Sequence, residues 1–305
     1  MFQRVRRGVL VLTFGATLAG ITATPVAAAQ PLATPEAGVT DVSLTPAQQQ
    51  ALTAKVAIAQ QIQQNPKVGS GRFTPAVVCP FATSPLSVST ASGSNLAGLT
   101  VSPATSCNGQ WGYVPTYPKV QEGATWCGPA SIQVASNYIW RMPQGADKWP
   151  QWQIAAWAGT GSGGTNGSSE TAALNRATAA SPYLPANWIY LSATSSQVST
   201  GSRWHSLLRT DIASYSMPQI VSVAPKDPGF GIYLDSWKNA PAQFAGHYIV
   251  LNGFQGAWDG TRGPIVTYDD SAIPPYGVSD ADPAADIYAM IMKTNVNKSG
   301  VLVAW

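Results

Sequence analysis

Cys127 stands six positions after Gln121, at the start of a stretch that the sequence predicts to be a helix. A helix start exposes unpaired backbone N–H groups and the positive end of the helix dipole, so a thiol there is biased towards the nucleophilic thiolate. The chemistry that this position favours is covalent catalysis through the Cys127 sulfur. The Gln121 amide and the Cys127 backbone N–H are candidate donors to the oxyanion formed when a thiolate attacks a carbonyl.

The chain has two histidines, His205 and His247, from which a thiol-dependent enzyme would draw its base. His247 is the predicted base, because it follows Gly246 at the start of a β-prone run, where strand pairing fixes a side chain near the sheet edge. His205 is predicted on a helix beside Trp204, where a histidine is usually a packing or surface residue.

A carboxylate is expected to hold the imidazole of His247 in one tautomer. The strand expected at 247–254 is followed by a turn centred near Asp259 and by a partner strand. In a hairpin that is symmetric about this turn, the residue opposite His247 lies near position 271. Asp269 and Asp270 lie within two residues of this point. The sequence does not fix the register, and a slip of one residue moves a side chain to the other face of the sheet. We predict Asp270 as the orienting residue, with Asp269 as the alternative.

Together these residues resemble family thirty-nine of the cysteine peptidases, the bacteriocin-leader-processing peptidases and their exported relatives in the papain-like superfamily. The resemblance covers about residues 117–272 and lies in three motifs: Gln121-x5-Cys127-Gly128-Pro129-Ala130-Ser131, Gly246-His247-Tyr248-Ile249-Val250-Leu251-Asn252-Gly253-Phe254, and Tyr268-Asp269-Asp270-Ser271. It implies the following roles: Cys127 as nucleophile, His247 as general base and then acid, Asp270 as orienter and Gln121 as oxyanion donor. The family usually has Asp-Pro where this chain has Asp270-Ser271.

The elements that would position these residues follow from hydrophobic periodicity. A helix from Gly128 to about Arg141 has an apolar stripe that would anchor it on a core. Further helices are expected at 151–157, 169–179 and 204–215, and strands at 219–223, 247–254, 263–268, 287–291 and 300–304. The glycine-rich segment 159–169 is expected to be a loop bordering the cleft. This pattern predicts an α+β domain, and the resemblance implies a papain-like fold in which the helix that begins at the nucleophile packs on an antiparallel sheet.

Three segments are predicted along the chain. Residues 1–29 are typical of a secretory signal peptide, with three arginines ahead of an apolar run and a small-residue cleavage site after Ala29. Residues 30–116 form an N-terminal extension, and residues 117–305 form the peptidase domain. Since no later apolar run reaches roughly 18 residues, the processed protein is expected to be soluble and extracellular, without a transmembrane segment.

The extension is expected to begin with a disordered leader, followed by a helix at about 45–64 that is capped by Thr45 and Gln48. Short β-prone pieces then alternate with Ser, Gly and Pro clusters. Cys79 and Cys107 are predicted to form a disulfide, and closing that loop of about 27 residues would contribute roughly 3 to 4 kcal/mol. Whether this segment is an inhibitory propeptide, a subdomain or a linker stays open.

Charge and composition limit which classes of molecule the protein is expected to bind. The chain has 17 basic and 14 acidic residues, and three of the basic ones belong to the signal peptide, so the processed protein is near neutral. Without a Lys/Arg run, no nucleic-acid partner is expected. Two distant histidines and three cysteines have no zinc-ligand spacing, so no metal or other cofactor is expected. A peptide or protein substrate is expected.

Two alternatives remain. The chain has eleven tryptophans, and some of them, for example Trp149, Trp152 and Trp157, would serve a non-catalytic cell-wall or surface-binding module by stacking on glycans. An amidase, a deamidase or a transglutaminase would use the same thiol and imidazole and differ in the amine released or accepted.

Overall fold

The computed structural model describes residues 45–64, 111–185, 187–227, 231–240, 246–256, 263–274, 276–277, 279–294 and 301–305. All of them belong to one compact unit that spans residues 34–305. Cys79, Cys107, the signal peptide and the β-prone pieces of the extension lie outside the described residues. Among the described residues, no helix is both long enough and apolar enough to cross a bilayer.

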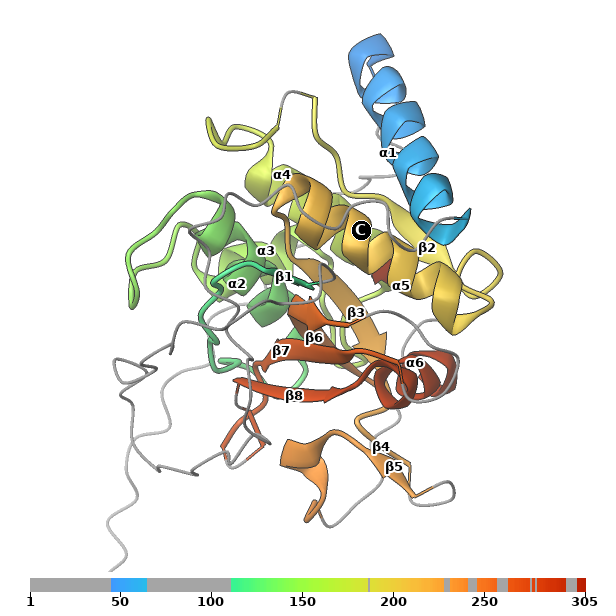
Figure 1. The fold of residues 1–305 in the computed structure, drawn as a ribbon. Coiled ribbons are helices and arrows are strands. Elements are labelled where there is room, and N and C mark those ends of the chain that lie inside the picture. The colour runs from blue at the N-terminus through green and yellow to red at the C-terminus, as the bar shows by residue number, and fades with distance from the viewer. Residues whose placement is uncertain are drawn as a thin grey trace, which may run out of the picture. The chain divides into compact units, whose positions relative to one another are not determined.

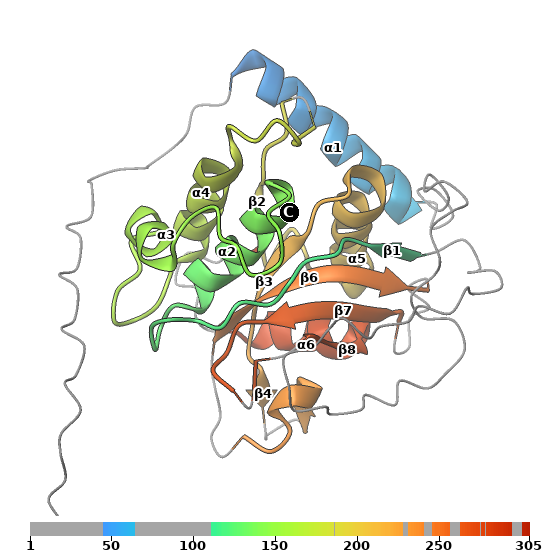
Figure 2. The same ribbon diagram turned by 90° about the vertical axis from the view of Figure 1, so that its left-hand side faces the viewer.

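The described residues form six α-helices, a π-helix, a 3-10 turn and nine strands (Figures 1 and 2). The helical elements are α1 (Pro46–Gln64), α2 (Cys127–Ile139), α3 (Gln151–Trp157), α4 (Gly167–Thr178), α5 (Gly201–Arg209), the π-helix η2 (Thr210–Tyr215), the 3-10 turn η3 (Asp235–Trp237) and α6 (Ala284–Lys293). The strands are β1 (Trp111–Tyr113), β2 (Ser192–Thr194), β3 (Gln219–Val223), β4 (Lys226–Asp227), β5 (Ile232–Tyr233), β6 (His247–Gln255), β7 (Ile265–Asp270), β8 (Ser279–Pro283) and β9 (Val301–Ala304).

Seven of the strands form one antiparallel sheet: six follow the order β2-β9-β3-β6-β7-β8, and the seventh, β1, also pairs with β6. The long strand β6 pairs with β3 over its first half, and β1 pairs antiparallel with residues 253–255 beyond it. Helices combined with an antiparallel sheet confirm the expected α+β class. The sheet begins at residue 111, within the segment that the sequence analysis assigned to the extension.

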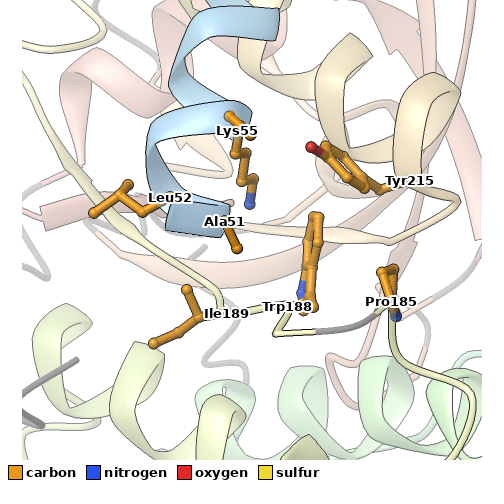
Figure 3. Close-up of a pocket in the computed structure, with 8 residues that line it drawn as sticks. Ala51, Leu52, Lys55, Pro185, Trp188, Ile189 and Tyr215 are labelled. Atoms are coloured by element: carbon orange, nitrogen blue, oxygen red, sulfur yellow. The ribbon is translucent and has the colours of Figure 1, made fainter. Parts of the chain in front are cut away.

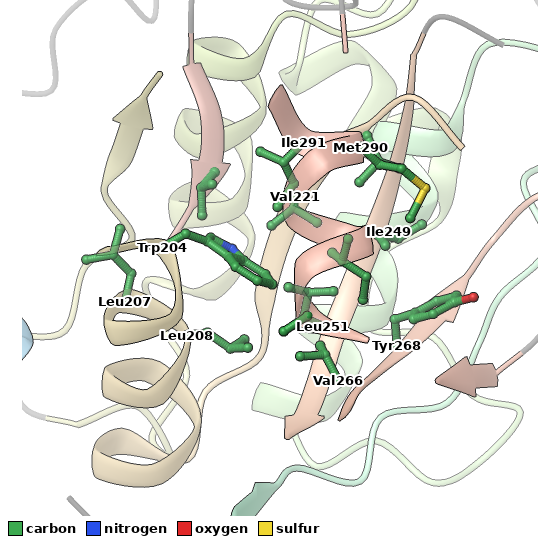
Figure 4. Packing of buried hydrophobic residues seen from close by; sticks show 14 of the residues in the cluster. Trp204, Leu207, Leu208, Val221, Ile249, Leu251, Val266, Tyr268, Met290 and Ile291 are labelled. Atoms are coloured by element: carbon green, nitrogen blue, oxygen red, sulfur yellow. The ribbon is translucent and has the colours of Figure 1, made fainter. Parts of the chain in front are cut away.

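The two faces of the sheet support two hydrophobic clusters, because alternate residues of a strand point to opposite sides. In β6, Tyr248 and Val250 pack with α2, α3 and α4, whereas Ile249 and Leu251 pack with α5 and α6. Figure 4 shows the second cluster, in which Trp204 of α5 and Met290 of α6 lie over the strands. The helix that carries Cys127 is therefore held on the sheet that carries His247.

One strand prediction was wrong. Residues 287–291 were expected to complete the sheet, but they lie in helix α6. Ala284, Ile287, Met290 and Ile291 are all buried and recur at helical spacing, so the short apolar run is one face of a helix. The edge strand is instead β8, whose polar sequence Ser-Asp-Ala-Asp-Pro carries little β signal.

Helix α1 begins as expected, with a capping box. The backbone N–H of Thr45 donates to Gln48 Oε1 at 3.0 Å, and the N–H of Gln48 donates to Thr45 Oγ1 at 3.2 Å. The helix packs against α5 and η2. An unexpected residue lies on its buried face, since the side chain of Lys55 is only 3% exposed.

The ammonium group of Lys55 is surrounded by one carboxylate and several aromatic rings from other elements of the domain. Its Nζ lies 3.0 Å from Oδ1 of Asp211, 3.9 Å from the ring centre of Trp188 and 4.6 Å from that of Trp305. Next to it, a pocket of about 180 Å³ lies between α1 and residues that include Trp188 and Tyr215 (Figure 3). The ion pair therefore joins the buried apolar residues Ala59 and Ile62 in holding α1 on the domain.

Candidate active site

Cys127 is the first residue of α2, as predicted, and its thiol is free and partly exposed. The helix is anchored by Ile132, Ala135 and Ile139, which are at most 2% exposed. Gly128 is required by close packing: a Cβ at this position would lie 2.6 Å from Oγ1 of Thr165, in the predicted loop. The sulfur is therefore fixed at the start of a helix that is anchored in the core.

The glycine-rich loop borders this helix start, as expected from the sequence. The hydroxyl of Thr125 donates to the carbonyl of Gly161 at 2.9 Å. Within the loop, Gly161 and Gly164 form a β-bridge, and the hydroxyls of Thr160 and Thr165 lie 2.7 Å apart. The loop is thus tied both to itself and to the segment that carries the thiol.

His247 and Asp270 lie side by side on neighbouring strands. Nε2 of His247 is 2.6 Å from Oδ1 of Asp270, and the two residues are 5% and 1% exposed. Asp270 pairs with Ile249, two residues along β6 from His247, so both side chains emerge on the same face. Since Asp270 occupies Nε2, the other ring nitrogen, Nδ1, is left for the thiol of Cys127.

Register decides between the two candidate carboxylates. Asp269 pairs with Val250 and turns to the opposite face. There its oxygens accept hydrogen bonds from the hydroxyls of Thr116, at 2.6 Å, and Ser279. Asp270 is thus the carboxylate next to the imidazole, and Asp269 ties the segment before α2 to the sheet.

The thiol and the imidazole are coupled through a hydrogen bond. Burial alone would raise the pKa of Cys127, but the hydrogen bond and charge of His247, together with the backbone N–H groups of Tyr248 and Gly128, bring it below its ordinary value. For His247, burial lowers the pKa, but the charge and hydrogen bond of Asp270 and the contact with Cys127 raise it to about 10. Both shifts favour the thiolate–imidazolium form of the pair.

Gln121 occupies a different position from the one its predicted role requires. Its side-chain nitrogen donates to the carbonyls of Gly123, at 2.8 Å, and Ala124, at 3.0 Å. Both amide protons are therefore directed at carbonyls of its own loop. The backbone N–H of Gln121 donates to Ser271 O at 2.8 Å, which joins the loop to the strand end beside Asp270.

Trp237 is a residue of this site that sequence reasoning missed. Its indole N–H donates to Oδ2 of Asp270 at 2.7 Å, and its ring centre lies 5.3 Å from that of His247. Tyr276 stacks on the outer side of Trp237, at 4.9 Å between ring centres. Trp237 comes from the short turn η3 in an irregular segment, so no periodicity in the sequence connects it with His247.

His205 lies away from these residues, as the sequence analysis expected. It is 2% exposed, and its ring packs edge to face on Phe254 at 5.5 Å. Burial, and after it the charge of Arg209, lowers its pKa to about 3, so the ring is neutral. Within the described ranges, no group of three or more His, Cys, Asp or Glu residues could hold a metal ion.

The comparison with known families agrees with this arrangement. No curated protein and no solved structure is detectably similar to the chain. The model of the Peptidase_C39 like family matches residues 112–289, which is more than half of the chain and includes α2, β6 and β7. The protein therefore belongs to the Peptidase_C39 like family, in agreement with the resemblance inferred from its motifs.

Proposed function

We propose that this protein is an exported cysteine peptidase with a papain-like fold, which cleaves peptide bonds by acyl transfer. One observation carries the proposal: the thiol of Cys127, the imidazole of His247 and the carboxylate of Asp270 form one continuous hydrogen-bonded set. Nucleophile, base and orienting group are each in contact with the next, as covalent catalysis requires. Membership of a peptidase-like family favours a peptide or protein substrate.

In the first half-reaction, the thiolate of Cys127 attacks the carbonyl carbon of the scissile peptide bond. The carbonyl π electrons move to oxygen, and a tetrahedral oxyanion forms. As this intermediate collapses, the C–N bond breaks and the imidazolium of His247 gives its proton to the leaving amine. An acyl group remains on the sulfur as a thioester.

In the second half-reaction, neutral His247 takes a proton from water, and the resulting hydroxide attacks the thioester carbonyl. The C–S bond breaks, the carboxylic acid leaves, and the thiolate and imidazolium are restored. Throughout both steps the Asp270 carboxylate accepts a hydrogen bond from Nε2–H of His247 and stays ionised, which keeps Nδ1 directed at the sulfur.

Stabilisation of the oxyanion is assigned to the backbone N–H of Cys127 and to the amide of Gln121. The first N–H groups of a helix have no intrahelical partner, so the Cys127 N–H at the start of α2 is a natural donor. For this role the Gln121 amide must exchange one of its two loop acceptors, the carbonyls of Gly123 and Ala124, for the substrate oxygen.

The contacts of the tryptophans do not favour the wall-binding alternative. Trp149 packs edge to face on Trp140 and on Trp157, at 6.5 and 5.1 Å between ring centres. Trp152 is 51% exposed. The contacts of Trp149 and Trp157 are thus those of a packed cluster, whereas Trp152 alone does not make a row of stacking platforms.

The test compares the processed protein with Cys127→Ala and Cys127→Ser on a mixture of peptides. We expect new amino termini with the native protein and none with either variant. Release of ammonia, or transfer of the acyl group to an added amine without new amino termini, would indicate a deamidase or a transglutaminase instead. Unchanged turnover in Cys127→Ala would reject thiol catalysis.

Export is tested separately, by amino-terminal sequencing of the protein from the culture medium. A start at Gln30 is expected, and a start close to residue 117 would mean that the extension is also removed.

A further inference from the structure

The single charged residue of helix α1 is buried rather than exposed to solvent. Among the 19 residues of this helix, Lys55 alone carries a charge, and its side chain is 3% exposed. Ala59 and Ile62 are also buried, and they follow Lys55 at helical spacing, so the three residues share one face. A lysine is almost never fully buried unless a partner compensates its lost hydration. The rest of the domain must therefore supply that compensation.

The compensation comes from one carboxylate and three aromatic rings. Nζ of Lys55 lies 3.0 Å from Oδ1 of Asp211, whose side chain is fully buried. The ring centres of Trp188, Trp305 and Tyr190 lie 3.9, 4.6 and 5.7 Å from the same nitrogen. Aromatic faces attract a cation at these distances. We call Asp211 and the three aromatic residues the ammonium site.

The ammonium site is held together by contacts that do not involve α1. Its aromatic residues come from two segments that pair with each other, since the backbone groups of Trp305 and Leu191 exchange two hydrogen bonds of 2.9 and 2.6 Å. The hydroxyl of Tyr190 donates to the carbonyl of Pro218 at 2.9 Å. Residues 65–110 separate α1 from β1 along the chain. The position of α1 is therefore set by the site that receives Lys55, and not by a short connection to the sheet.

The second oxygen of Asp211 limits which cation the ammonium site accepts. Oδ2 of Asp211 accepts a hydrogen bond from the side-chain amide of Gln219 at 3.2 Å, so one oxygen is left for the cation. A guanidinium group pairs best with both oxygens of a carboxylate, whereas an ammonium group is a compact charge that needs one. Methyl groups on the nitrogen would not fit within its 3.0 Å separation from Oδ1. The site therefore favours a primary ammonium group over a guanidinium or a quaternary ammonium group.

Helix α1 fills its docking surface only in part. A pocket of about 180 Å³ remains between the helix and the domain, and both Lys55 and Trp188 line it (Figure 3). The indole N–H of Trp188, a residue that is 9% exposed, has no hydrogen-bond partner among the described residues. Empty volume forfeits packing energy, so a surface shaped for α1 alone would be expected to close this space. The pocket leaves room for a small solute beside Lys55.

We propose that the ammonium site is a binding site for the lysine side chain of an amphipathic helix, and that α1 is its occupant within the same chain. The buried face of α1 defines the ligand class: a lysine, followed at the spacing of Ala59 and Ile62 by a small and an aliphatic residue. A helix of another molecule with this pattern occupies the site when α1 is undocked. The proposal is independent of the proposed peptidase activity.

The first test replaces the missing side chain by a free cation. Lys55→Ala, in the full processed chain, removes the atoms of a propylammonium ion. Propylammonium chloride near saturation is expected to raise the unfolding temperature of this variant by about 3 °C or more. Sodium chloride, 1-propanol, propylguanidinium and propyltrimethylammonium at equal concentration should each raise it by less than about 1 °C. The measurement is made at pH 8, because burial raises the pKa of Asp211 to about 6 and the carboxylate must be ionised.

The second test supplies the helix as a separate molecule. Lys55→Glu in the full processed chain places a like charge against Asp211 and is expected to undock α1. A fluorescent peptide of residues 45–64 should then bind this variant, as measured by anisotropy. The same peptide with Lys55→Met should bind at least about tenfold more weakly, because it leaves the carboxylate buried without a cation. The native chain should also bind the peptide at least about tenfold more weakly, because its own helix competes at a high effective concentration.

Two control variants separate the ammonium site from general effects of the cation. Lys55→Ala combined with Asp211→Asn should lose the response to propylammonium. Lys119→Ala breaks the more exposed ion pair with Asp147 and should not respond.

Two results would overturn the proposal. Equal stabilisation of Lys55→Ala by propylammonium and 1-propanol, or a response that survives Asp211→Asn, would mean that the site does not recognise an ammonium group. Equal binding of the lysine and methionine peptides to Lys55→Glu would mean that a helix is not recognised through its lysine. If Lys55→Ala does not fold alone, the yield of folded protein after refolding in propylammonium, compared with 1-propanol, decides. None of these measurements depends on peptide turnover, so loss of the peptidase proposal would leave them unchanged.

Discussion

Nε2 of His247 lies 2.6 Å from Oδ1 of Asp270, and the neighbouring Asp269 faces the other side of the same strand. The second oxygen of Asp270 accepts the indole N–H of Trp237 at 2.7 Å, and Oδ1 also accepts the backbone N–H of Ala272 at 2.8 Å. The carboxylate is thus held by two fixed donors besides the imidazole. It can select one tautomer of His247 because it cannot itself rotate.

Replacement of the two neighbouring aspartates should separate catalysis from stability. Asp270→Asn is expected to lower kcat on the order of 100-fold, because the amide has no negative charge to stabilise the imidazolium and can turn its NH2 group towards Nε2. Asp269→Asn should leave kcat close to the native value and lower the unfolding temperature, because it weakens the hydrogen bonds of Thr116 and Ser279. Equal losses of kcat in both variants would contradict the assignment.

The pH dependence of kcat/KM should reflect the titration of Cys127 and His247. The active form needs a thiolate and an imidazolium, so activity is expected to fall as pH rises through about 10, where His247 loses its proton. It should also fall at acid pH as the thiolate is protonated, below the ordinary range of a thiol. His247→Gln should shift the alkylation midpoint of Cys127 upward.

The stability of the fold has a related pH dependence. The pKa of His247 is raised in the folded state, so its contribution to stability is fully present below its unfolded value of 6.5 and is lost as pH rises through about 10. Urea unfolding at a series of pH values measures this effect. His247→Gln should flatten the alkaline part of the curve, and an unchanged slope there would argue against a charged His247.

Trp237 should contribute to catalysis through its N–H group. Trp237→Phe keeps an aromatic ring against His247 and removes the donor to Asp270, and a loss of kcat of roughly tenfold is expected from a hydrogen bond to a charged group. Trp204→Phe is the matched control, because this buried indole donates to Oε1 of Gln219 at 3.2 Å and not to Asp270. The control should lower stability and leave the pH profile of kcat/KM unchanged.

The buried ion pair between Lys55 of α1 and Asp211 should be costly to break on one side and much less costly to remove as a pair. Lys55→Met leaves Asp211 buried without a cation and is expected to lower the free energy of unfolding by about 3 kcal/mol or more. Adding Asp211→Asn removes that charge and should restore most of the loss. The exposed pair of Lys119 and Asp147 is the control, and Lys119→Met should change the free energy of unfolding by less than about 1 kcal/mol. A double variant no more stable than Lys55→Met would contradict this account.

The position of α1 also bears on whether the extension blocks the site. Asp211 holds Gln219 at the start of β3, whereas Val223 at the end of β3 pairs with His247. Four residues of extended strand separate these points by about 13 Å. Helix α1 therefore docks at the other end of the strand pair from the imidazole.

Local sequence determined the elements and the order of the chemical groups. The capping box of α1, the helix that begins at Cys127, the bounds of α3 and β3, and the strand that begins at His247 all follow from short-range periodicity and capping, which depend on residues close in the chain. The pairing of Cys127 with His247 could be predicted because the chain offers two histidines and His247 stands at the start of a strand in a family-like motif.

Tertiary structure decided what depends on register and burial. Only the pairing of β6 with β7 selects Asp270 over Asp269, since a slip of one residue exchanges the faces. Whether residues 284–293 form a helix or a strand was decided by the packing of one apolar face, because a short apolar run is compatible with both structures. The roles of Trp237 and Lys55 come from contacts between segments distant in the chain, where a polar side chain is buried only because its partner is supplied by another element.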